Sequence, residues 1–147
     1  MPTDIGTISC YCGLCYFTED STMAIKYTIG IDGDLLRVKA SGNDDNLQQV
    51  KEYGLAIIEA AKTHNAKSAL CDETELHYEL DTFDTFESAK YIAEHVPGMA
   101  KLAIVCKREQ MDDASFWETT AVNRGLQVRV FNTIRDAELW LAPSQMK

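Results

Sequence analysis

The sequence predicts one α/β domain: a mixed sheet of about five strands, with an antiparallel N-terminal hairpin and a largely parallel remainder, covered by four helices. The last third of the chain is the most informative part. Residues 100–106 and 126–131 are short apolar runs, whereas residues 111–124 and 133–141 have helical spacing. Strands that alternate with helices in this way are typical of right-handed crossovers and a parallel sheet.

The first two strands are expected to form the hairpin. Residues 24–29 and 35–40 are rich in β-forming side chains. Residues 30–34, which join them, contain an Asp-Gly pair of the kind favoured in hairpin turns. The two runs should therefore pair with each other before the chain enters its first helix.

A helix that ends near Thr63 and a short buried strand are expected next. Asp44 and Asp45 stand at the start of this helix, where carboxylates can cap free N–H groups. An apolar stripe along residues 47–61 gives the helix one buried face. Residues 68–71 form a short apolar run, which is typical of a strand buried on both faces.

Residues 72–81 carry five carboxylates and are expected to form a loop. This loop leaves the carboxyl end of a predicted parallel strand, the edge at which open α/β sheets place their binding sites. A helix with one apolar face follows over residues 83–96. The start of that helix and the loop before it are therefore the first place to look for function.

The predicted domain spans residues 23–142. Residues 1–22 are expected to be a poorly ordered N-terminal extension, and residues 143–147 a C-terminal tail. Met23 opens the first strand directly and is a candidate natural start.

The composition excludes several classes of partner. The net charge of −9 disfavours nucleic acid and anionic membrane surfaces. Apolar runs stay well short of the roughly 18 residues that a membrane span requires. The N-terminus lacks the basic and apolar regions of a secretory signal, so we expect a cytoplasmic protein.

Five cysteines in such a setting favour reduced thiols. Cys10, Cys12 and Cys15 are close enough in sequence to share a metal, and the last two form a C-x-x-C. A closed zinc site needs about four ligands. Cys71 and Cys106 end predicted buried strands and are interpreted as core thiols instead. A thiol- or metal-dependent function through the N-terminal cysteines is thus a second alternative, and no cofactor is predicted.

The sequence favours no catalytic mechanism. His64, His77 and His95 lie at predicted helix ends or in loops rather than beside a nucleophile. The glycine-rich loops that cradle nucleotide phosphates are absent from the sequence. We therefore expect a protein that is not an enzyme.

Three stretches carry a family resemblance, together with the order β-β-α-β-α-β-α-β-α. They are residues 31–36 in the hairpin, residues 69–72 with the loop and helix that follow, and residues 128–133 with 137–141 at the end. In these, the chain from Met23 to Ala142 resembles the STAS domains, and in particular their SpoIIAA-like branch of small stand-alone bacterial proteins.

The resemblance implies a non-enzymatic regulatory module that binds an anti-sigma-factor or kinase-like protein. Classical antagonists of this family are switched off by phosphorylation of a Ser or Thr that follows an Asp at the start of the helix after the third strand. Asp81-Thr82 matches this pair when one residue is inserted in the preceding loop, and Phe83 and Asp84 replace the usual second Ser and Gly. The candidates for the partner surface or phosphoswitch are Asp72, Glu75, Glu79, Asp81, Thr82, Thr85 and Ser88.

A small-molecule or lipid-binding module of the same fold is the first alternative. Aromatic side chains near the second and third crossover helices could line an apolar pocket between them. These pocket candidates are Tyr78, Phe83, Phe86, Phe116 and Trp117. A homodimer is a further assembly that the sequence leaves open.

Overall fold

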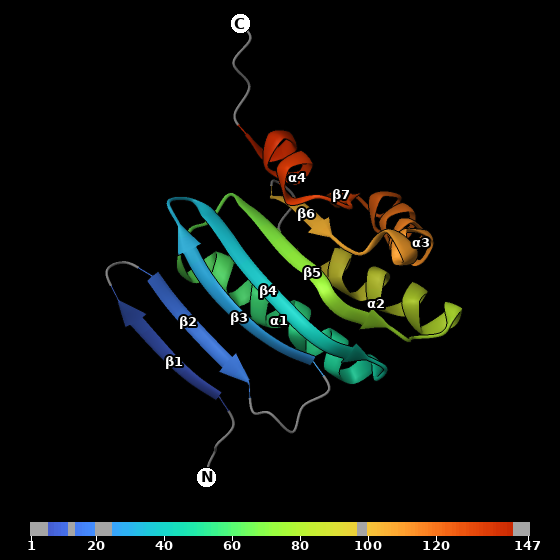
Figure 1. The fold of residues 1–147 in the computed structure, drawn as a ribbon, viewed down its shortest axis with the longest axis horizontal. Coiled ribbons are helices and arrows are strands. Elements are labelled where there is room, and N and C mark those ends of the chain that lie inside the picture. The colour runs from blue at the N-terminus through green and yellow to red at the C-terminus, as the bar shows by residue number, and fades with distance from the viewer. Residues whose placement is uncertain (1–5, 12–13, 20–24, 97–99, 143–147) are drawn as a thin grey trace, which may run out of the picture.

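The computed structural model describes residues 6–11, 14–19, 25–96 and 100–142 (Figure 1). The strands are β1 (Gly6–Tyr11), β2 (Leu14–Glu19), β3 (Ile25–Asp32), β4 (Leu35–Asp44), β5 (Ser68–Tyr78), β6 (Lys101–Val105) and β7 (Gln127–Phe131). The helices are α1 (Leu47–Thr63), α2 (Thr82–His95), α3 (Met111–Val122) and α4 (Ile134–Leu141), and a short 3-10 helix, η1 (Arg108–Gln110), leads into α3.

Strands β3 to β7 form one mixed sheet in the order β3-β4-β5-β6-β7. β3 and β4 pair as an antiparallel hairpin, and every later pair is parallel. Gly33 adopts a φ of 66° in the hairpin turn, a conformation that glycine reaches without steric cost. The mixed sheet and its N-terminal hairpin confirm the fold class predicted from the sequence.

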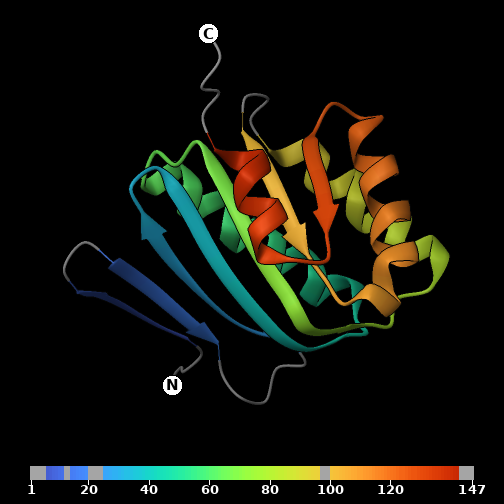
Figure 2. The ribbon, with the colours of Figure 1, turned by 45° about the horizontal axis from the view of Figure 1, so that its top comes forward.

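Helices cover both faces of this sheet (Figure 2). On one face α1, α2 and α3 enclose the larger core, to which buried residues such as Ile29, Val38 and Ile92 belong. On the other face α4 packs through Ala137 against a smaller cluster that includes Leu70. α4 leaves the β3–β4 end of its face uncovered (Figure 2).

The central strand β5 is longer than predicted. The interpretation of residues 72–81 as a loop was wrong, because β5 continues to Tyr78 and the connection to α2 spans only residues 79–81. β4 also continues, so the two strands stay paired in parallel as far as Asp44 and Tyr78. Backbone pairing along β4 overrides the preference of a carboxylate-rich segment for a loop.

A β-bulge interrupts this pairing. Lys39 pairs with Asp72 and Ser41 with Glu75, so two residues of β5, Glu73 and Thr74, oppose a single residue of β4. The carboxylate of Asp72 accepts hydrogen bonds from the backbone N–H of Thr74 at 3.1 Å and from its hydroxyl at 2.7 Å. This local turn holds the extra residue in place.

The far half of β5 extends beyond β6, whose last pair is Val105 with Asp72. There the side-chain amide of Gln110 takes the place of a neighbouring strand. It accepts a hydrogen bond from the backbone N–H of Tyr78 at 2.9 Å and donates one to the carbonyl of Leu76 at 2.8 Å. One side chain thus satisfies the backbone where strand pairing has ended.

The start of α1 also differs from the prediction. Asp44 and Asp45 were expected to cap this helix, but Asn46 is the capping residue, and its side chain accepts a hydrogen bond from the backbone N–H of Gln49 at 3.0 Å. Asp44 instead ends β4, because the strand runs on past the residue where the sequence suggested that it stops. Its carboxylate therefore does not cap α1.

The N-terminal segment contains two strands that the sequence analysis did not predict. β1 and β2 pair antiparallel, with Cys10 opposite Cys15, and form a two-stranded sheet of their own. Cys12, Met23 and residues 143–147 lie outside the described residues. The proposed boundary of the domain at residue 23 stays a prediction.

Candidate functional site

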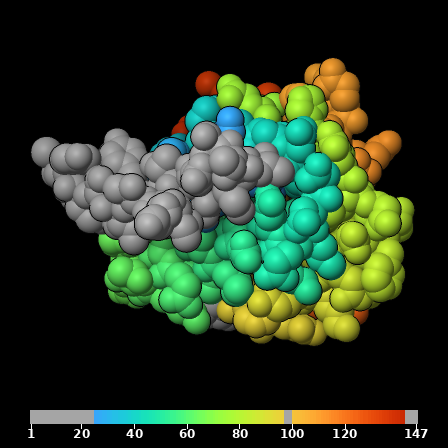
Figure 3. Space-filling model, turned by 90° about the horizontal axis from the view of Figure 1, so that it is seen from below, coloured from blue at the N-terminus to red at the C-terminus, as the bar shows by residue number. Residues whose placement is uncertain are grey.

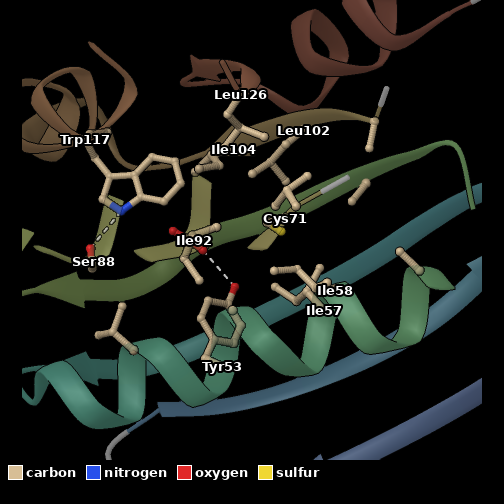
Figure 4. Close-up of a pocket in the computed structure, with 18 of the residues that line it drawn as sticks. Tyr53, Ile57, Ile58, Cys71, Ser88, Ile92, Leu102, Ile104, Trp117 and Leu126 are labelled. Carbon is tan, nitrogen blue, oxygen red and sulfur yellow. Dashed lines mark hydrogen bonds between the residues drawn. The ribbon is translucent and has the colours of Figure 1, made fainter. Parts of the chain in front are cut away.

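A cavity of about 400 Å³ lies between the sheet and its three helices (Figure 4). α1, α2 and α3 supply its walls on one side, and β5 and β6 supply the floor. This volume falls within the range of small-molecule sites, which is about 300–1,000 Å³. α2 packs mainly against α1 and α3 rather than against the strands, so space remains beneath it. At the surface α1 and α2 are adjacent (Figure 3).

The walls of the cavity are mainly apolar. Branched aliphatic side chains from three elements point into it: Ile57 and Ile58 from α1, Ile92 from α2, and Leu102 and Ile104 from β6 (Figure 4). Leu126, just before β7, also lines it. Water in such a space would find few hydrogen-bonding partners, whereas an apolar ligand would be well matched.

Gly54 sets how closely α1 approaches α2 at the cavity. A Cβ atom at this position would lie 2.1 Å from Cδ1 of Ile92, which is closer than any real contact. The helices can meet at this distance because residue 54 has no side chain. The glycine therefore holds one wall of the cavity in place.

Trp117 forms part of the wall from α3. Its indole Nε1–H donates a hydrogen bond to the Ser88 hydroxyl at 2.9 Å (Figure 4), and that hydroxyl donates to the Thr85 carbonyl at 3.0 Å. The polar edge of the indole is thus satisfied by α2, and its ring is left as an apolar surface toward the cavity.

The main polar feature of the cavity is the carboxyl group of Glu73, which the bulge directs inward. Glu73 is only 7% exposed. Its Oε2 accepts a hydrogen bond from the Tyr53 hydroxyl at 2.7 Å (Figure 4), and its Oε1 accepts one from the Tyr78 hydroxyl at 2.5 Å. Because a buried charge is costly unless it is hydrogen-bonded, the two tyrosines make this position tolerable.

Burial controls the proton affinity of this acidic cluster. It raises the pKa of Glu73, although the two tyrosine hydroxyls oppose the shift. Asp44 also lines the cavity, and burial raises its pKa from 3.8 to about 7. Hydrogen bonds from the backbone N–H groups of Glu79 and Leu80 oppose this increase, whereas repulsion from Glu73 adds to it. Desolvation is thus the dominant effect at both carboxyl groups.

The two described free cysteines are buried, as predicted for core thiols. Burial raises the pKa of Cys71 well above 9 and that of Cys106 to about 11. Because the thiolate is the reactive form, neither thiol is prepared for nucleophilic chemistry at neutral pH. Among the described residues, His, Cys, Asp and Glu side chains do not gather in a group that could hold a metal. The side chains of Cys10, Cys12 and Cys15 lie outside that description.

The predicted pocket aromatics fall in different places. Tyr78 and Trp117 line the cavity. Phe83 and Phe116 are 66% and 40% exposed, respectively. Phe86 is not among the lining residues either, and the Arg124 guanidinium lies over its ring at 5.4 Å. The structure therefore brings two of the five side chains together at the cavity.

The predicted partner surface divides among three places. Asp72 and Glu75 project from the α4 side of the sheet, where the Lys39 ammonium lies 3.3 and 3.6 Å from their carboxylates. Asp81 caps α2 by accepting a hydrogen bond from the backbone N–H of Asp84 at 2.8 Å. Glu79 and Thr82 lie next to Asp81, and Thr82 is exposed.

Two further members of that predicted surface belong to the interior instead. Thr85 lines the cavity, and Ser88 is only 1% exposed beneath α3. The exposed part of the candidate phosphoswitch is thus confined to the loop before α2 and its first residue, Thr82.

Sequence reasoning did not place Glu73, Tyr53 or Asp44 at a pocket, and it assigned Asp44 to a helix cap instead. Glu73 belonged to a run of carboxylates that looked like a solvated loop. The sequence did contain one signal for this strand. Inward-facing side chains alternate up to Glu73, and after one extra residue the alternation resumes at Leu76 and Tyr78. An interrupted alternation of this kind indicates a bulge.

Comparisons with known proteins bear on the fold. Neither the protein-family models nor the curated proteins include a match to this chain. The solved structure of an anti-sigma factor antagonist from Mycobacterium paratuberculosis aligns with a TM-score of 0.57 at 12% identity, over 80% of this chain and 93% of that one.

A second solved structure covers nearly the whole chain. It is an uncharacterized protein of the DUF3478 family with a SpoIIAA-like fold, from Shewanella loihica PV-4, with a TM-score of 0.51, 21% identity, and coverage of 97% of this chain and 99% of that one. The chain thus has the SpoIIAA-like fold, as the residues in its hairpin, central strand and C-terminal end suggested. None of the helices that the structure describes is long and apolar enough to cross a membrane.

Proposed function

We propose that this protein is a non-catalytic binding module that holds an apolar small molecule in the cavity beneath α2. The observation that carries the proposal is a cavity of about 400 Å³, walled by aliphatic side chains, inside a small domain. Protein interiors are normally packed as densely as organic crystals, with few voids larger than a water molecule. A space of this size is costly to leave empty and is best explained by an occupant.

The proposal is tested by binding of an uncharged apolar dye. Nile red should bind with one-to-one stoichiometry and gain fluorescence on entering the cavity. Ala61→Phe adds a ring to a lining position of α1 and should abolish binding. Glu59→Phe adds the same ring at an exposed position of the same helix, outside the cavity, and should leave binding unchanged. Equal dye binding by both variants and the wild type would refute the cavity as the site.

The exposed start of α2 supports a second function, regulation through a protein partner. Phe83 is 66% exposed and lies directly after Asp81 and Thr82, so an apolar ring is presented among acidic groups. A solved protein of this fold is an anti-sigma factor antagonist. We infer that an anti-sigma-factor or kinase-like partner would dock here, and that a phosphate on Thr82 would add charge beside Asp81 and Glu79 and weaken docking.

A pull-down from native extract, followed by titration of the partner found, tests this second function. Thr82→Glu should weaken binding while preserving the fold, because the first turn of a helix favours a carboxylate. Ser115→Glu, at an exposed position in the first half of α3, is the matched control and should bind normally. Glu79→Lys should slow association with a basic partner, most strongly at low salt. Unchanged binding by Thr82→Glu and Glu79→Lys would move the interface elsewhere.

A further inference from the structure

The two ends of the cavity differ in chemistry. Its lining follows α1 from Val50 to Lys62, which corresponds to about 18 Å at 1.5 Å per residue. One end lies at the carboxyl edge of the sheet, where β4 ends at Asp44 and β5 ends at Tyr78. Both of these residues line the cavity, as does Glu73. Asp44 and Glu73 thus lie together at one end of the cavity, whereas the lysines that line it, Lys62 and Lys101, lie away from that end.

The carboxylate of Glu73 retains hydrogen-bonding capacity. A carboxylate offers about four acceptor positions on its two oxygens. Tyr53 and Tyr78 each donate one hydrogen bond, one to each oxygen. The ion pairs formed within the described part of the chain include neither Glu73 nor Asp44. A nine-tenths buried acceptor with open positions therefore faces an apolar space.

Two lysines, Lys62 and Lys101, line the cavity, but neither neutralises its acidic end. Lys62 lies nine residues beyond Tyr53 on α1, about 13 Å further along the helix. The Lys101 ammonium lies 4.9 Å from the centre of the Trp140 ring, which belongs to α4 on the opposite face of the sheet. A ligand is thus left to supply the donor and the charge that the acidic end lacks.

We propose, on the basis of the ligand-binding function above, that the cavity selects an apolar molecule with a protonated amine as its head group, held by Glu73 with Asp44 beside it. An ammonium group carries three N–H donors and no acceptor, which matches acceptor positions that the tyrosines leave open. Its bonds to carboxylates are charge-assisted and short. At this end of the cavity, a carboxylate or phosphate head group would instead meet like charge in a poorly solvated space.

The proton affinities of the cluster support this assignment. Burial raises the pKa of Glu73 and brings that of Asp44 to about 7, so the poorly solvated surroundings disfavour both negative charges. A bound cation would stabilise both ionised forms.

Three probes with the same chain and different head groups test the proposal: decylammonium, decanol and decanoate. Binding is followed by the fluorescence of Trp117, which lines the cavity, in a Trp140→Phe background that removes the second indole. Moderate salt screens non-specific attraction of the amine to the acidic surface. We expect decylammonium to bind with a Kd at least about tenfold below that of decanoate, because a hydrogen bond to a charged group contributes enough binding free energy for a ratio of this size.

Substitutions identify the group that selects the amine. Glu73→Gln keeps the shape and one acceptor but removes the charge, and it should lose about tenfold in affinity for decylammonium while decanol binding changes little. Glu59→Gln makes the same change at an exposed position of α1 outside the cavity and should bind like the wild type. Urea unfolding checks that each variant is folded, and Asp44→Asn serves as the second variant should Glu73→Gln fail to fold.

The possible results separate the two proposals. Decanoate binding as tightly as decylammonium, or an unchanged amine affinity in Glu73→Gln, would overturn the head-group inference and leave the cavity as a ligand site. Failure of all three probes to bind, together with failure of Nile red, would overturn the proposed function and the inference that rests on it.

Discussion

Replacing Asp44 by Asn should change how the stability of the protein depends on pH. The Asp44 carboxylate accepts a hydrogen bond from the backbone N–H of Glu79 at 2.5 Å, and burial raises its pKa from 3.8 to about 7. The folded protein therefore binds the proton of the Asp44 carboxyl group more tightly than the unfolded chain does. The stabilisation that this protonation gives the folded state is fully present below pH 3.8, and it is lost as the pH rises through about 7.

The two pKa values set the magnitude. Integrating the proton linkage between pKa values of 3.8 and about 7 gives a loss of about 2.6 kcal/mol between about pH 5 and pH 8. Residual contact with solvent reduces this to about 1–2 kcal/mol. The amide that Asp44→Asn introduces would keep an oxygen that accepts the Glu79 N–H bond, but it does not titrate, so the variant should lack this loss.

Urea unfolding of both proteins at about pH 5, 6, 7 and 8 measures the effect, since linear extrapolation gives the free energy of unfolding at each pH. The difference in stability between Asp44→Asn and the wild type should shift by about 1–2 kcal/mol in favour of the variant over this range. Asp45→Asn removes the same charge from the exposed neighbouring position and serves as the control. Parallel stability profiles for Asp44→Asn and the wild type would refute the electrostatic reasoning.

Three further predictions concern stability. Gly54→Ala should lower the free energy of unfolding in urea by about 1 kcal/mol, because the clash of the added Cβ with Ile92 outweighs the gain in helix propensity. Adding Ile92→Val should recover part of that loss in a double-mutant cycle, whereas strict additivity would contradict the contact. Tyr53→Phe should cost about 1–2 kcal/mol, and more at high pH than at low pH, because the hydroxyl stabilises ionised Glu73. Deletion of residues 1–22 should lower the Tm by less than about 8 °C in calorimetry, and a larger decrease would make the segment part of the domain.

The sequence predicted the fold well because the signals for it are local. The Asp-Gly turn and its flanking β-rich runs indicated the hairpin of β3 and β4, and alternating apolar runs and amphipathic stripes indicated the later parallel strands. The errors occurred where pairing between distant segments decides the structure. β5 continues through residues 72–78 because β4 runs beside it, and the same extension moves Asp44 from a helix start to a strand end.

The candidate site was harder to predict because a cavity is a property of packing. Helical spacing placed Tyr78 and Trp117 among the pocket candidates, but it could not show that Phe83 and Phe116 point outward. The volume beneath α2 depends on how two helices meet at Gly54, which has no sequence pattern of its own. It also depends on a bulge at Glu73, whose one signal is an interrupted alternation within a run of carboxylates.

The side chain of Gln110 has a consequence for assembly. Beyond the end of β6, the Gln110 side-chain amide forms hydrogen bonds with the backbone N–H of Tyr78 and the carbonyl of Leu76. Without it, these backbone groups of β5 would form an open strand edge. Open edges recruit strands from other molecules and lead to swapped dimers or aggregates. Replacing Gln110 by Ala would uncover this edge, so light scattering should detect more concentration-dependent self-association than in the wild type. A single amide would then determine whether this sheet ends within one molecule or continues into the next.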